Sequence, residues 1–166
     1  MKSSSIAIAS LAWAGAVFAS PLHARAGALC EDIEYIIGDY GTLKGSLGGA
    51  NIIIPGLSGR EAGKVVREFL AFLDPANANV YELYESIPGC VATGVAEDKP
   101  PTAATCAALP KVIADVAQTV TLMSNLANAK DLPDRLEIDG LQEVTDDASV
   151  RIVSVQTTLK ALGCTV

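Results

Sequence analysis

Residues 29–47 read LCEDIEYIIGDYGTLKGSL, and the spacing of their apolar side chains indicates the fold class. Its large apolar side chains follow one another at alternating intervals of four and three residues, and they are Leu29, Ile33, Ile36, Tyr40, Leu43 and Leu47. Side chains at these intervals share one face of an α-helix, whereas a half-buried strand would repeat them at every second residue. The stretch therefore predicts a helix with a single buried stripe.

A second set of residues follows the same rhythm but is small: Gly38, Gly41, Gly45 and Gly48. Each glycine costs about 1 kcal/mol relative to alanine inside a helix. Two interpretations stay open at this point. Either the helix ends near Gly38 and a flexible loop follows, or it persists and the glycines form a bare groove that a flat ligand or another backbone can approach closely.

The chain after this helix contains further helical segments separated by breaks. Ser58 and Glu61 predict a capping box for a helix that ends near Leu73. Asp74 and Pro75 then predict a break and the start of another helix, which ends at residues 88–89.

Two later stretches repeat the alternation of four and three. Thr102 is a candidate N-cap for a helix that is interrupted or begins at Pro110 and that has the stripe Leu109, Ile113, Val116, Val120, Met123 and Ala127. Asp139 and Gln142 predict the start of a last helix with the stripe Leu141, Val144, Ala148, Ile152, Val155, Leu159 and Leu162. Since no window alternates at period two for long, we predict an all-α bundle of four to five helices.

The composition supports one apolar, acidic domain. The chain has 166 residues, of which 50% are hydrophobic and 19% are charged, with 19 acidic side chains against 12 basic ones. This length favours a single domain with a substantial core. The net charge of −7 argues against binding to nucleic acid, because too few basic side chains are present to neutralise a run of phosphates.

The first residues have the features of a secretory signal peptide. Lys2 precedes an apolar stretch that runs from Ile6 to about Phe18 and is too short to span a bilayer. We expect residues 1–19 to be removed, residues 20–26 to form a short pro-piece, and residues 27–166 to form one helical domain. A cut after Ala26 and a buried N-terminal helix are the alternatives. We expect a secreted, extracellular protein with no transmembrane anchor.

Four cysteines lie in the expected mature chain, and an even number in an oxidising compartment predicts two disulfides. Three pairings are possible, and we favour Cys90–Cys106 and Cys30–Cys164. The first would close a short Pro-rich loop and contribute roughly 3 kcal/mol by chain entropy. The second would join the two ends of the domain. A metal site is disfavoured, because the chain contains no Cys-x-x-Cys motif and no histidine other than His23.

The sequence offers little for catalysis, and we expect neither an enzyme nor a cofactor. No Gly-x-Ser-x-Gly motif is present, and Ser58 is better explained as a helix cap. Asp139, Glu143 and Asp147 share a helical face, which is more typical of a solvated surface than of an acid–base site. An EF-hand alignment over residues 134–146 fails, because Arg135 occupies the position of the first calcium ligand.

Apolar residues in excess of a small core indicate binding. The helix predicted between Ser58 and Leu73 has apolar side chains over more than half of its circumference. Ile52, Ile53 and Ile54 form an apolar patch. These residues either line a site for an apolar ligand or fill a tight core. The candidate ligand-binding residues are Ile52, Ile53, Ile54, Phe69, Phe72, Leu73, Val116, Val120 and Met123.

The leader Phe18-Ala-Ser-Pro-Leu-His-Ala-Arg-Ala26, followed by a helical chain rich in small residues, resembles secreted fungal proteins of the hydrophobic surface-binding protein A family. The resemblance is one of organisation over most of the mature chain, and it implies a helical bundle that binds lipids or waxy surfaces. The four cysteines depart from that family. Plant invertase and pectin methylesterase inhibitors also resemble this plan, but their first two cysteines lie close together, whereas here Cys30 stands alone.

Two functions from different classes follow. The first is a secreted helical protein that binds an apolar small molecule, such as a lipid or fatty acid, or an apolar surface. The alternative is a secreted effector or inhibitor that acts by binding an extracellular protein.

Overall fold

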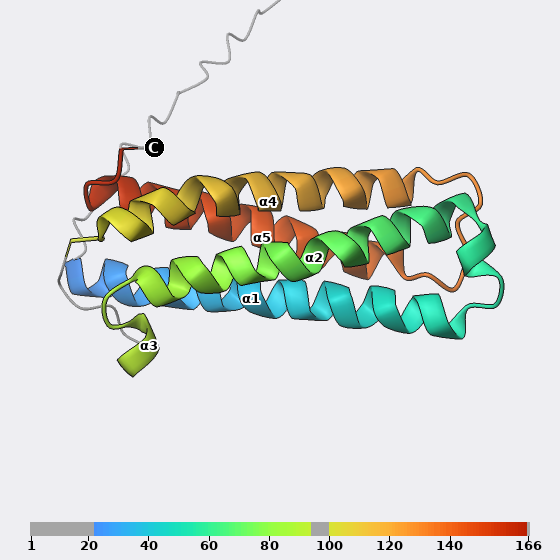
Figure 1. The fold of residues 1–166 in the computed structure, drawn as a ribbon, viewed down its shortest axis with the longest axis horizontal. Coiled ribbons are helices and arrows are strands. Elements are labelled where there is room, and N and C mark those ends of the chain that lie inside the picture. The colour runs from blue at the N-terminus through green and yellow to red at the C-terminus, as the bar shows by residue number, and fades with distance from the viewer. Residues whose placement is uncertain (1–21, 94–99, 166) are drawn as a thin grey trace, which may run out of the picture.

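The computed structural model describes residues 22–93 and 100–165, so the predicted signal peptide lies outside the described residues. Four long helices run antiparallel to their chain neighbours (Figure 1): α1 (Leu22–Ile53), α2 (Glu61–Ser86), α4 (Ala103–Ala127) and α5 (Ile138–Ala161). The connections contain two short helices, η1 (Leu57–Gly59) and α3 (Cys90–Thr93). α1 packs against α2 and α5, and α4 packs against the same two helices. The prediction of an all-α bundle is confirmed.

The stripe in α1 forms one side of the core. All six of its apolar residues are buried, with exposures of 2% or less. The helix continues through all the glycines to Ile53, which decides between the two open interpretations. Burial of a large apolar side chain contributes about 1.5–3 kcal/mol, so the stripe outweighs the helical cost of the glycines.

The predicted break at Asp74-Pro75 is wrong, because α2 is continuous from Glu61 to Ser86. The buried residues before and after the proline, Phe69, Leu73, Ala76, Val80 and Leu83, keep one unbroken alternation of four and three. Pro75 itself is exposed. The lost backbone hydrogen bond is thus offset by a continuous buried face.

The predicted capping box of Ser58 and Glu61 is also wrong, because Ser58 belongs to η1 and makes no cap. The first turn of α2 is capped from the connection between α4 and α5. The N–H of Glu61 donates to Asp131 Oδ2 at 2.7 Å, and that of Ala62 donates to Oδ1 at 2.9 Å. Both hydrogen bonds lower the pKa of Asp131 from its usual value, and the bond from Ala62 has the larger effect.

The starts of the last two long helices differ from each other. Thr102 caps α4 in a reciprocal arrangement with Thr105, which confirms the predicted N-cap, and α4 continues through Pro110. α5 begins at Ile138, so Asp139 lies inside its first turn, and the predicted cap by Asp139 and Gln142 is wrong. A backbone turn from Pro133 to Leu136 leads into this helix instead.

The predicted disulfide pairing is wrong. Cys30 is joined to Cys90 and Cys106 to Cys164, with Cα–Cα distances of 5.5 and 5.3 Å, in place of Cys30–Cys164 and Cys90–Cys106. All four cysteines lie at one end of the bundle, where several helix ends are neighbours. Each disulfide therefore closes one helical hairpin, the first around α1 and α2 and the second around α4 and α5.

Two glycines in left-handed conformation direct this pairing. Gly89 has φ 90° and leads into α3, which places Cys90 against the start of α1. Gly163 has φ 112° and ends α5 in a Schellman motif, in which the N–H of Cys164 donates to the carbonyl of Leu159. The turn brings Cys164 to Cys106 at the start of α4. The number of residues between the cysteines does not predict which of them are paired.

By length and composition, α4 is the one helix in the described part of the chain that could cross a membrane. The sequence alone predicts no membrane-spanning helix, since even the apolar stretch of the leader is too short. In the bundle, Leu109, Val112, Val116 and Met123 of this helix are buried. The predicted stripe is therefore only partly right, because Ile113 is partly buried and Val120 and Ala127 are exposed. Its apolar side chains thus contribute to the core shared with α2 and α5.

Candidate functional site

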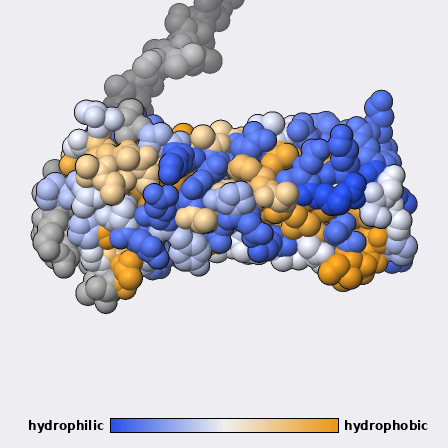
Figure 2. Space-filling view, viewed as in Figure 1, coloured by the Kyte–Doolittle hydropathy of each residue, from blue (hydrophilic) through white to orange (hydrophobic). Residues whose placement is uncertain are grey.

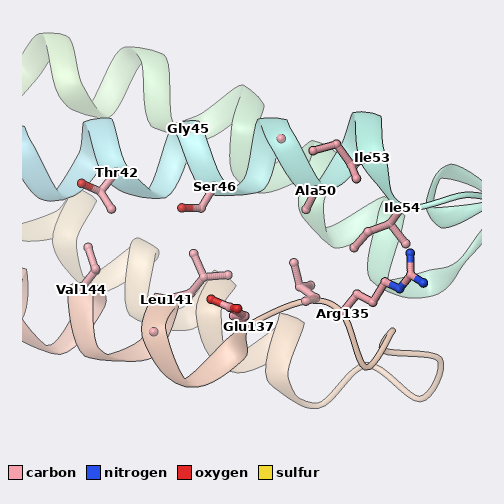
Figure 3. Close-up of a pocket in the computed structure, with 13 residues that line it drawn as sticks. Thr42, Gly45, Ser46, Ala50, Ile53, Ile54, Arg135, Glu137, Leu141 and Val144 are labelled. Atoms are coloured by element: carbon pink, nitrogen blue, oxygen red, sulfur yellow. The ribbon is translucent and has the colours of Figure 1, made fainter.

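An open groove of about 560 Å³ lies between the second half of α1 and the beginning of α5 (Figure 3). We call it the α1–α5 groove. Its α1 side consists of Thr42, Gly45, Ser46, Gly49, Ala50, Ile53 and Ile54. Its other side consists of Arg135, Leu136, Glu137, Gly140, Leu141 and Val144. Most of these side chains are apolar or absent, and this lining suits an apolar ligand.

Three glycines account for the open volume. A Cβ atom added to Gly45, Gly49 or Gly140 would meet no atom within 4 Å. At Gly63 of α2, by contrast, a Cβ atom would lie 1.8 Å from the carbonyl oxygen of Leu57, so close packing requires that glycine. The groove glycines serve no such packing within the chain, and what they provide is space.

Exposed isoleucines border the groove at the end of α1. Ile52 is 84% exposed and Ile53 is 72% exposed, whereas Ile54 is buried. An apolar patch is visible in Figure 2 at the lower right, where Figure 1 places the C-terminal end of α1. Adjacent large apolar side chains in water are typical of a binding surface rather than of a structural element.

Two charged side chains line the groove without partners. Neither Arg135 nor Glu137 makes a side-chain hydrogen bond or ion pair with any residue in 22–93 or 100–165. The carboxylate of Glu137 points into the space between α1 and α5, and the guanidinium of Arg135 lies near Ile54 (Figure 3). These groups remain available to a ligand.

A charged cluster lies one helical turn beyond Thr42 and Val144, and we call it the Asp39 cluster. It consists of Asp32, Tyr35 and Asp39 from α1 and of Asp147 and Arg151 from α5. Arg151 donates to Asp147 at 2.7 Å and to Asp32 at 3.2 Å, and its guanidinium lies 3.8 Å from the ring centroid of Tyr35. The donors of Arg151 are thus directed to two carboxylates, neither of which is Asp39.

Asp39 is the unsatisfied member of this cluster. Its Oδ2 atom is buried and has no hydrogen-bond partner among the described residues. Burial, and then the charge of Asp147, raise the pKa of Asp39 to about 6, while Arg151 opposes part of the rise. A carboxylate in this position would gain from a donor that the chain does not supply.

The structure divides the predicted ligand-binding residues among three places. Ile53 and Ile54 line the α1–α5 groove, and Ile52 lies beside them on the surface. Val120 and Met123 line a smaller groove of about 290 Å³ between α4 and α5. The others belong to the core or pack against it, namely Phe69, Phe72, Leu73 and Val116. The predicted residues therefore do not form one site, and Ile54 and Met123 belong to the core as well as to a groove.

Sequence reasoning missed the α5 side of the groove and the role of Asp39. Gly140 follows the predicted start of the last helix and carries no signal of its own in the sequence. Of the predicted glycine rhythm in α1, only Gly45 lines the groove, whereas Gly38, Gly41 and Gly48 do not, and Gly49, which does, lies outside that rhythm. A carboxylate on the glycine-bearing helix, at a position that faces another helix, is the signal that identifies Asp39.

The described residues contain no group of three His, Cys, Asp or Glu side chains placed to hold a metal ion. Asp139 and Glu143 are exposed, and Asp147 pairs with Arg151. No protein-family model matches the sequence, and comparison with curated proteins and with solved structures gives no match. The resemblance to hydrophobic surface-binding proteins stays a prediction, and the groove, the exposed isoleucines and the Asp39 cluster are the observations on which function is argued.

Proposed function

We propose that this protein is a secreted binding protein that holds an apolar small molecule, or attaches to an apolar surface, through the α1–α5 groove and the isoleucines beside it. One observation carries the proposal. Two largely exposed isoleucines border an open groove whose glycines leave space that the chain does not fill. Neither feature improves the packing of the bundle.

The disulfides support the extracellular part of this proposal. Two disulfides, with no free cysteine among the described residues, indicate folding in an oxidising compartment. The predicted leader at residues 1–19 would deliver the chain to such a compartment. We propose a binding role without catalysis, since the groove contains no nucleophile with an adjacent base.

Filling the groove tests the proposal. The variant Gly49→Leu places a side chain in the open space, and Gly38→Leu is its matched control, because Gly38 lies on the same helix, has equally open surroundings and does not line the groove. In a titration of delipidated protein with an uncharged fluorescent long-chain alcohol, we expect saturable binding near one equivalent. The affinity should fall at least tenfold in Gly49→Leu and stay unchanged in Gly38→Leu.

A second measurement addresses apolar surfaces. We expect the double variant Ile52→Ser, Ile53→Ser to adsorb less to alkyl-coated beads than the parent. The double variant Val150→Ser, Val153→Ser is the control, because these valines of α5 are 70% and 59% exposed and do not line the groove. Equal adsorption of all three proteins, together with no saturable binding of the fluorescent alcohol, would exclude the proposal and favour the protein-binding alternative.

A further inference from the structure

The α1–α5 groove and the Asp39 cluster lie on one continuous line along two helices. On α1, Asp39, Thr42, Ser46, Gly49 and Ile53 are separated alternately by three and four residues. On α5, Asp147, Val144, Gly140 and Glu137 follow the same alternation in the opposite direction. Because such residues share a helical face, the line is about 21 Å long from Asp39 to Ile53. Its ends differ in chemistry, since one is acidic and the other is apolar.

The acidic end has more negative charge than the chain neutralises. Among the described residues, Arg151 is the cation that pairs with both Asp32 and Asp147, and its charge and that of Asp147 also act on Asp39. The guanidinium of Arg151 is directed to Asp32, Asp147 and the ring of Tyr35. Along the groove, the free cation Arg135 is offset by the free carboxylate of Glu137. The charge that remains unneutralised is therefore negative, and it is located at the Asp39 cluster.

We infer that the ligand of the α1–α5 groove is an amphiphile with a cationic head, a long-chain alkylammonium, whose head contacts Asp39 beside Asp147 and whose chain runs toward Ile53. This inference rests on the proposed function and adds the class of ligand. An ammonium has three donors and no acceptor, which suits the partly exposed carboxylate of Asp39, in which one oxygen lacks a hydrogen-bond partner among the described residues. The alkyl chain would cover the glycine positions and contact Leu141 and Val144.

An anionic head is disfavoured by the same geometry. A carboxylate head at the Asp39 cluster would add a fourth negative charge beside a single guanidinium. A carboxylate head at Arg135 would lie at an exposed position with Glu137 on the same groove wall. The repulsion at the first position is larger, because Asp39 is partly buried there.

Three ligands with the same chain and different heads test the inference: dodecylamine, dodecanol and dodecanoate. Each is titrated below its aggregation concentration into delipidated protein at pH 7.5, with displacement of a bound apolar fluorophore as the signal. We expect the amine to bind roughly tenfold more tightly than the alcohol, the order expected for one charge-assisted hydrogen bond at a partly exposed site, and the carboxylate to bind most weakly.

The variant Asp39→Asn should abolish the preference for the amine over the alcohol while leaving alcohol binding unchanged. Asp146→Asn is the matched control, because it removes the same charge from the neighbouring position on α5, which lines the smaller groove facing α4. Far-UV circular dichroism verifies that both variants are folded. In the parent, the preference for the amine should also decrease as the pH falls through about 6, since Asp39 loses its charge there.

The possible results separate the two proposals. Amine and alcohol affinities within twofold of each other, or an Asp39→Asn variant that keeps the preference, would overturn the cationic head and leave the apolar groove in place. Tightest binding of dodecanoate would overturn it in favour of an anionic head at Arg135. Failure of all three ligands to bind would overturn this inference, and it would overturn the proposed function as well if the parent and the Ile52→Ser, Ile53→Ser variant also adsorbed equally to alkyl-coated beads.

Discussion

The two ends of the bundle are built on different principles. At one end, Cys30–Cys90 and Cys106–Cys164 join helix ends covalently, and the hydroxyl of Thr105 donates to the carbonyl of Ser86. The opposite end contains the groove, the exposed isoleucines and the connection between α4 and α5. There the helices are held by hydrogen bonds to Asp131 and by packing.

The two ends therefore contribute differently to the stability of the bundle. Exposed apolar side chains and empty volume destabilise the end that contains them, because burial that could stabilise the fold is not used. Disulfides at the other end limit the unfolded chain and so stabilise the whole bundle. The groove end can therefore depart from ideal packing without unfolding the protein.

Reduction of both disulfides should have the largest effect on this arrangement. Each closes a loop with a sequence separation of 60 or 58 residues, and the chain-entropy estimate for such a loop is about 4 kcal/mol. A small domain with a total stability of roughly 5–15 kcal/mol should then lose most of its helical signal at 37 °C. Thermal unfolding followed by circular dichroism, with and without reductant, measures this. An unchanged midpoint would mean that the disulfide end does not stabilise the groove end.

Phe69→Ala tests the core between the two ends. The ring is fully buried in α2 and lines neither of the two grooves, so its removal should cost about 3–5 kcal/mol. Phe72→Ala is the control, because Phe72 is only partly buried against the core, and its loss should be smaller. Denaturant unfolding measures both. A loss for Phe69 well below this range, together with a change in apolar-ligand affinity, would show that its ring lines a ligand cavity.

Asp131→Asn should weaken the groove end selectively and by less than the loss of Phe69. The substitution removes the charged acceptor for the N–H groups of Glu61 and Ala62. Their amide exchange should accelerate while amides near Cys106 stay protected. Because the pKa of Asp131 is lowered in the folded state, this stabilisation is present above the unfolded pKa and is lost as the pH falls through the folded pKa. Uniformly faster amide exchange at both ends would contradict the idea that the groove end and the disulfide end open independently.

The smallest effect concerns Asp39 and pH. Its pKa is raised from 3.8 to about 6 in the folded protein, so the folded state binds the proton first. Stability from this group should therefore increase as the pH falls from 7 to 4, by roughly 1 kcal/mol or less once solvent screening is allowed for. Asp39→Asn should remove this component, as seen in the difference between the unfolding free energies of parent and variant at pH 7 and pH 4.5. A pH-independent difference would show that Asp39 is not perturbed.

The sequence predicted features that depend on local spacing. The stripe from Leu29 to Leu47 determined both the helix and its buried face, and Thr102 was identified as a cap from its own neighbours. Features that depend on contacts between distant segments were not predictable. The carboxylate that caps α2 comes from Asp131, about 70 residues away, and is indistinguishable in the sequence from other loop acids.

The errors have the same origin. A proline after an aspartate usually marks a helix start, but at Pro75 a continuous buried face on both sides overrode that preference. The disulfide pairing depended on the directions set by Gly89 and Gly163, which are not available from the spacing of the cysteines. For the candidate site, spacing indicated one wall of the groove through Gly45 and the isoleucines. The other wall required the packing of α5 on α1.

The positions of the disulfides also determine how this molecule would carry mechanical load. If the protein is pulled by its two termini, tension enters at Cys30, crosses to Cys90, follows the chain to Cys106 and leaves through Cys164. Nearly all of the four long helices lie outside that path, inside the two covalent loops. Between Cys30 and Cys164, this path could reach at most about 55 Å, the extended length of residues 90–106, before covalent bonds bore the force. Because α1 and α5 belong to different covalent loops, stretching residues 90–106 would draw the two hairpins apart and separate the walls of the groove.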